Sequence, residues 1–101
     1  MAIPVGVADV ERVLRPWLGT LFLSANPLAA DVAAHMRAYA PYRQTLESLR
    51  DELESLLLVK LNRLTSGSLT VITDNYHTRR LGTGQIAAIT DDLMGVIFDK
   101  L

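Results

Sequence analysis

The chain has 101 residues, half of them hydrophobic, with a net charge of −1 at neutral pH and no cysteine. This length predicts one domain with a single small core. The lack of cysteine excludes disulfide bonds, thiolate metal sites and thiol catalysis, and it fits a cytoplasmic protein. Eleven acidic and ten basic residues nearly cancel, so no overall positive field attracts nucleic acid.

The apolar half of the composition is not arranged as a membrane span. The longest uncharged stretch, residues 16–30, is interrupted by Pro16, Gly19, Asn26 and Pro27, whereas a spanning helix needs about 20 apolar residues in one run. The N-terminal residues also lack the basic segment of a secretory signal. A chain this small leaves much of its surface in water, so we expect other chains to cover part of the apolar excess.

Residues 9–24 form the first predicted helix, with Asp9 as its N-cap. Pro16 cannot donate a hydrogen bond to the carbonyl of Arg12, so we expect a kink at Pro16 or a restart near Arg15. Apolar side chains recur at intervals of three and four, which places them on one face. These residues are Val10, Val13, Leu14, Trp17, Leu18 and Leu21.

Residues 27–39 form the second predicted helix. Asn26 is the expected cap and Pro27 the expected first helical residue, because proline suits the position where no backbone donor is needed. One face of this helix contains Leu28, Val32, His35 and Tyr39. His35 has Asp31 and Tyr39 one turn away, so a packed or partner-facing histidine with a local hydrogen bond is expected.

Residues 41–65 form the third and longest predicted helix, which begins at Pro41. One side of it is lined by Leu46, Leu49, Leu53, Leu56, Leu57, Leu61 and Leu64. Leu58 and Val59 point away from this leucine side, so the second half of the helix is apolar nearly all round. A helix of that kind is expected to be covered from more than one direction.

Residues 69–80 predict a β-hairpin. The β-branched segment Leu69–Thr73 is one strand, Tyr76–Arg80 is the other, and Asp74 and Asn75 supply a tight turn because both tolerate positive φ. A two-stranded hairpin is marginal alone, so it must lie on the helices or on another chain.

Arg79 and Arg80 precede the glycine-rich residues 82–84 and the start of the last predicted helix. Guanidinium groups beside free backbone N–H groups can hold a phosphate or a carboxylate. The sequence has neither a Walker A loop nor a dinucleotide fingerprint here. The two arginines are therefore either exposed charges without a partner, or they bind an anion or the carboxylate of a partner chain. In a neighbouring copy the candidate carboxylates are Asp91, Asp92 and Asp99.

The last predicted helix, residues 84–101, is apolar over roughly 200° of its circumference, about twice the width that packing on one core requires. Its apolar residues are Ile86, Ala87, Ile89, Leu93, Met94, Val96, Ile97, Phe98 and Leu101. We expect this helix to pack against its own chain on one side and against a neighbouring chain on the other.

Residues 83–90 resemble the first helix of the helix-turn-helix motif in bacterial repressors. The resemblance covers about a dozen residues. Beyond these residues the sequence no longer matches the motif. Asp91 occupies the position of the turn, and Asp92 occupies a position where an apolar residue is expected. Residues 93–100 offer one lysine among acidic and apolar groups, which does not suit reading of a major groove. A DNA-binding regulator is therefore only a minor alternative.

The sequence shows no pattern of catalytic or metal-binding residues. No serine lies in a Gly-x-Ser-x-Gly setting, and neither zinc-site nor calcium-loop spacing occurs. We therefore expect no enzyme activity, no metal or other cofactor and no small-molecule substrate.

These features predict a mainly α domain of four helices, the first kinked at Pro16, with a β-hairpin between the third and fourth. The expected function is a structural subunit that packs into a homo- or hetero-oligomer, such as a ring or tube in the head–tail or tail region of a bacteriophage. It would then lie in the cytoplasm or in a virus particle. The alternative is a regulatory module that binds a protein or ligand near His35 or Tyr39. The expected interface residues are Leu58, Val59, Met94, Phe98 and Leu101.

Overall fold

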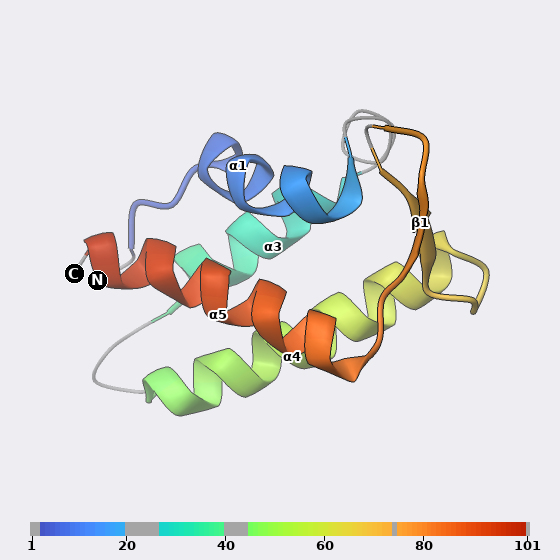
Figure 1. The fold of residues 1–101 in the computed structure, drawn as a ribbon. Coiled ribbons are helices and arrows are strands. Elements are labelled where there is room, and N and C mark those ends of the chain that lie inside the picture. Colours follow the sequence, from blue (N-terminus) through green and yellow to red (C-terminus); the bar gives the residue numbers. More distant parts are fainter. Residues whose placement is uncertain (1–2, 20–26, 40–44, 74, 101) are drawn as a thin grey trace.

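The computed structural model describes residues 3–19, 27–39, 45–73 and 75–100. Over these residues it confirms the mainly α architecture, with four helices and a two-stranded antiparallel hairpin between the third and the fourth (Figure 1). The elements are α1 (Val7–Leu18), α3 (Leu28–Arg37), α4 (Leu46–Leu64), β1 (Thr70–Ile72), β2 (Thr78–Arg80) and α5 (Thr83–Lys100).

Helix α1 begins earlier than predicted, because Asp9 is not its N-cap. Gly6 occupies the cap position with extended backbone, and its N–H donates to Asp9 Oδ2 at 2.9 Å. Asp9 therefore caps the helix from its third residue, as in a capping box. The bond from Gly6, together with the charges of Lys100 and Arg12, lowers the pKa of Asp9.

Pro16 lies inside α1, and the helix runs past it to Leu18 without a restart. Gly19 then ends the helix at a φ of 80°, which glycine adopts without strain, and its N–H donates to the carbonyl of Arg15 at 2.9 Å. The helix therefore stops short of residue 24, although residues 20–26 lie outside the described part of the chain. The kink at Pro16 stays a prediction.

The next two helices begin later than predicted. Pro27 precedes α3 instead of opening it, and the predicted cap Asn26 lies outside the described residues. The backbone of Thr45 is extended, and its hydroxyl accepts a hydrogen bond from the N–H of Ser48 at 3.0 Å. Thr45 therefore starts α4 afresh, so a continuous helix from Pro41, itself outside the described residues, is excluded.

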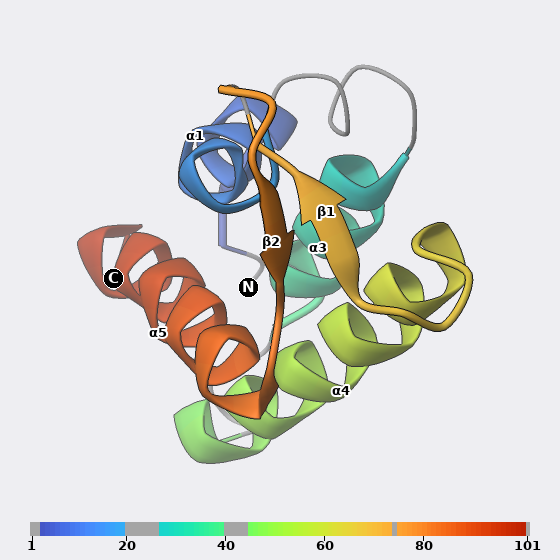
Figure 2. The same cartoon turned by 45° about the vertical axis from the view of Figure 1, so that its right-hand side comes forward.

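The four helices surround one core. Helix α1 packs on α3 and α5, and α4 packs on the same two helices from the other side. Figure 2 shows the hairpin lying across one end of this bundle. The hairpin is anchored there by Val71 and by Leu81 just after β2, both of which are buried. On α4 the buried side chains recur every fourth residue, at Leu49, Leu53, Leu57 and Leu61.

Helix α5 is covered from two sides by its own chain, α1 on one side and α4 on the other. Its buried residues are Ile86, Ile89, Thr90, Leu93, Met94 and Ile97. Thr90 was not expected in the core. Its hydroxyl donates to the carbonyl of Ile86 at 2.8 Å, which satisfies the buried polar group. The wide apolar arc of α5 therefore needs no neighbouring chain over these residues.

The hairpin has the predicted antiparallel pairing but a different turn. Val71 lies opposite Arg79 in the register. Tyr76, not Asn75, has positive φ, at 59°, and its N–H donates to the carbonyl of Thr73 at 2.9 Å. This loop is one residue longer than predicted, with a left-handed last residue, as is common after a type I turn. Asp74 lies outside the described residues.

Candidate functional site

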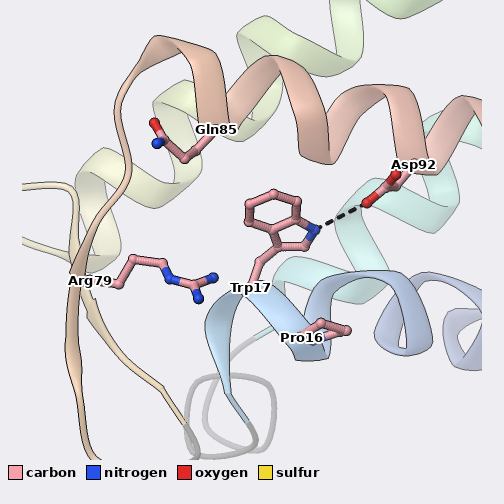
Figure 3. A pocket seen from close by; sticks show the side chains of 5 residues that line it. All are labelled: Pro16, Trp17, Arg79, Gln85 and Asp92. Atoms are coloured by element: carbon pink, nitrogen blue, oxygen red, sulfur yellow. Dashed lines mark hydrogen bonds between the residues drawn. The ribbon is translucent and has the colours of Figure 1, made fainter.

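A cleft of about 520 Å³ opens where the end of α1, strand β2 and the first half of α5 meet (Figure 3). Its lining residues are Pro16, Trp17, Arg79, Gln85 and Asp92. We call it the Trp17 cleft. Trp17 is the single tryptophan of the chain, and it lies on α1 in the helical turn that contains Pro16.

The indole of Trp17 connects three elements. Its Nε1–H donates to Asp92 Oδ2 on α5 at 3.2 Å. Figure 3 shows the Arg79 side chain reaching from β2 toward the ring, with the guanidinium carbon 5.8 Å from the ring centroid. This is the range of a cation–π contact. Trp17 therefore holds the hairpin on α1 and α5.

A second hollow, of about 510 Å³, lies beside the Trp17 cleft and shares Pro16 and Arg79 with it. We call it the basic hollow. It is lined by Arg15, Pro16, Thr73, Asn75, His77, Thr78 and Arg79. Among the described residues, neither Arg15 nor Arg79 has a carboxylate partner. The two arginines of this hollow are therefore open to an acidic group.

The structure separates the two arginines that the sequence grouped together. Consecutive residues of a strand face opposite sides, and Arg80 lines neither the basic hollow nor the Trp17 cleft. Arg79 instead lines the basic hollow together with Arg15 and His77. Sequence reasoning missed these two, because the hairpin brings His77 next to a helix about sixty residues earlier.

Two of the three candidate carboxylates on α5 are already used within the chain. Asp91 Oδ1 accepts from Arg50 Nε on α4 at 2.8 Å, and Asp92 accepts from Trp17. The bond to Asp91 also raises the pKa of Arg50. Asp91 and Asp92 therefore stabilise the packing of α5, and they are poorly placed to receive arginines from a neighbour.

His35 pairs with a distant residue instead of the local one that we predicted. Its Nε2 lies 3.0 Å from Glu52 Oε2 on α4, while Asp31 pairs with Lys60 at 3.2 Å. Tyr39 is buried in the core and does not stand at the mouth of a pocket. The hydrogen bond between His35 and Glu52 and the ion pair between Asp31 and Lys60 both join α3 to α4.

An open hollow of about 500 Å³ lies along α3 and α4 next to His35. We call it the α3–α4 hollow. It is lined by His35, Asp51, Glu52, Ser55, Leu56 and Val59. Leu56 and Val59 supply its apolar lining, which we call its floor, and we call the carboxylates of Asp51 and Glu52 its acidic rim.

The predicted interface residues fall into three groups. Leu58, Val59 and Phe98 are exposed by 41%, 49% and 58%. Met94 is buried in the core, so another chain could not meet it, and Leu101 lies outside the described residues. The hairpin adds two exposed apolar side chains that the sequence did not single out, Ile72 at 50% and Tyr76 at 80%.

Several other kinds of site find no support in the described part of the chain. No group of three or more histidine, aspartate or glutamate side chains there could hold a metal ion. Helix α5 passes through Asp91 and Asp92 without a turn, so residues 83–100 form no helix-turn-helix motif. None of the described helices has both the length and the apolar character that crossing a bilayer requires.

No protein family model matches this chain, and neither a characterised protein nor a solved structure matches it. What the protein does must therefore follow from its own surfaces. The features that stand out are the basic hollow beside the hairpin and the apolar outer side of α4.

Proposed function

We propose that this chain is a small non-enzymatic subunit that works by associating with copies of itself. The observation that carries the proposal is the outer side of α4, where the consecutive residues Leu58 and Val59 are both exposed beside the α3–α4 hollow. Apolar side chains grouped in this way on a closed domain favour contact with another protein.

The core does not need these side chains. The leucines of the inner side of α4 are fully buried against α3 and α5. Among the described residues, every buried side-chain nitrogen or oxygen has a hydrogen-bond partner. The fold is therefore complete without Leu58 and Val59, which remain available for a second chain.

Static light scattering over a range of protein concentrations tests self-association. The mass of one chain is 11.1 kDa, and we expect the average mass to rise above it as the concentration increases. A single monomer mass up to millimolar concentration would contradict the proposal.

Phe98→Asp is expected to leave the fold intact and to weaken association about tenfold, a loss of about 1.4 kcal/mol. Phe98 is 58% exposed on α5 and not on the outer side of α4, so we expect it to contribute as a peripheral residue and not at the centre of the contact. Circular dichroism checks the fold, and the dissociation constant from sedimentation equilibrium gives the effect. An unchanged constant would remove Phe98 from the interface.

A further inference from the structure

Two separate surfaces of the molecule complement each other. The first consists of the exposed Tyr76 at the turn of the hairpin together with the basic hollow beside it. The second is the α3–α4 hollow, with an apolar floor and an acidic rim. Figures 1 and 2 show the hairpin reaching from the end of α4 to the far side of the bundle, next to the end of α1. One molecule therefore cannot place its hairpin turn in its own α3–α4 hollow.

We infer that the hairpin turn of one copy docks in the α3–α4 hollow of the next copy. This inference rests on the proposed function and names the two surfaces that meet. Tyr76 contacts Leu56 and Val59 of the neighbour, and the arginines of the basic hollow face the acidic rim.

The conformation of Tyr76 supports its role as the inserted residue. A φ of 59° is unfavourable for a non-glycine residue and costs about 1–3 kcal/mol. It is held by the bond from the Tyr76 N–H to Thr73 and by the bond from the Thr73 N–H to the carbonyl of His77, each 2.9 Å long. The ring remains 80% exposed, so the strain brings no packing within the chain. Exposed aromatic side chains of this kind are frequent among residues that dominate binding energy.

The charges agree with the same arrangement. Arg15 and Arg79 lack carboxylate partners among the described residues, and the carboxylate of Asp51 likewise forms no ion pair there. Glu52, which also bonds His35, supplies the second carboxylate of the rim beside Asp51. Bringing the two surfaces together therefore places opposite charges around an apolar centre.

The charges also disfavour a symmetric dimer. A contact between two hairpins would bring basic hollows together, and a contact between two α3–α4 hollows would bring acidic rims together. Both arrangements pair like charges, which costs free energy. Since the mating surfaces are different and lie apart, each copy uses both at once. Such a heterologous contact builds a ring if its rotation closes and a filament if it does not.

The test uses two variants, each of which damages one surface. Tyr76→Asp removes the aromatic ring from the turn, and aspartate is one of the residues that tolerate this left-handed φ. Val59→Asp places a charge on the floor of the α3–α4 hollow at a position that is half exposed. Ala8→Asp is the control, because it adds the same charge at an exposed position in the first turn of α1, where it is favourable.

We expect Tyr76→Asp and Val59→Asp to be folded monomers when studied separately, at concentrations where the wild type and Ala8→Asp assemble. An equimolar mixture of the two is expected to give a dimer by sedimentation velocity. The Val59→Asp chain still has its hairpin and the Tyr76→Asp chain still has its hollow, so one intact contact remains.

The outcomes separate the two proposals. If the wild type assembles but the mixture stays monomeric, or if either variant assembles as the wild type does, the head-to-tail contact is wrong and self-association stands. If the wild type is itself a monomer at every concentration, both are wrong. Addition of 0.5 M salt to the mixture is expected to weaken the dimer, since it screens the charges around the contact.

Discussion

Ile89→Asp is expected to leave the chain unfolded at 25 °C. Ile89 is fully buried on α5, between α1 and α4. Losing its burial costs about 1.5–3 kcal/mol, and an unpaired carboxylate in the core costs several kcal/mol more. A domain of this size has a total stability of only about 5–15 kcal/mol. Circular dichroism and the thermal transition would show the loss of helix and of cooperative melting.

The neighbouring residue provides the control for this substitution. Ala88 lies on the outer side of α5 and is partly exposed, so Ala88→Asp adds the same charge without placing it in the core. We expect this variant to melt within a few degrees of the wild type. A cooperative transition at the wild-type temperature in Ile89→Asp would contradict the arrangement of α5 between α1 and α4.

Leu53→Ala is expected to destabilise the fold by about 2–5 kcal/mol, because it opens a cavity on the buried side of α4. In a domain of about 100 residues this corresponds to a fall in melting temperature of about 10–25 °C. Leu58→Ala changes the same residue type on the same helix, but on its exposed side. We expect it to change stability by less than about 0.5 kcal/mol.

Urea denaturation of the two variants measures this difference directly. Its midpoint should fall in Leu53→Ala and stay near the wild-type value in Leu58→Ala, with a similar slope in both. Equal losses in the two would mean that Leu58 is part of the core. The interface proposal for α4 would then lose its main support.

Periodicity was enough to predict the elements but not where they begin. The leucine spacing of α4 and the β-branched segment before the turn each identify one kind of element, since the apolar pattern repeats along the chain. The first residues depend on single hydrogen bonds. Asp9 and Thr45 are both good capping residues, yet Asp9 acts from inside its helix and Thr45 interrupts a predicted one.

The site was harder to predict because it joins distant parts of the chain. Arg79 stood out beside a glycine-rich segment, but its neighbours Arg15 and Trp17 come from the first helix. His35 had a suitable carboxylate one turn away and nevertheless pairs with Glu52 across a helix contact. Local spacing carries no information about such pairs, since they depend on how the helices pack.

The width of the apolar arc on α5 was the strongest reason to expect a neighbouring chain. In the fold, helices of the same chain cover most of that arc. Helices α1 and α4 both pack on α5 and bury Met94 and most of the arc, although Phe98 remains 58% exposed. The residues that support assembly are therefore Val59 on the outer side of α4 and Tyr76 on the hairpin. Both side chains stay exposed in the folded chain.

Disulfide trapping tests the head-to-tail contact most directly, because the native chain has no cysteine that could react in the background. Tyr76→Cys and Val59→Cys are combined in one chain and oxidised mildly at a concentration where the wild type assembles. The hairpin turn lies next to the end of α1, across the bundle from α4 (Figures 1 and 2), so we expect no bond within the chain. The contact predicts a ladder of covalent multimers on a non-reducing gel, with at most dimers from either single variant. A double variant that stays monomeric, or stops at dimers as the single variants do, would contradict it.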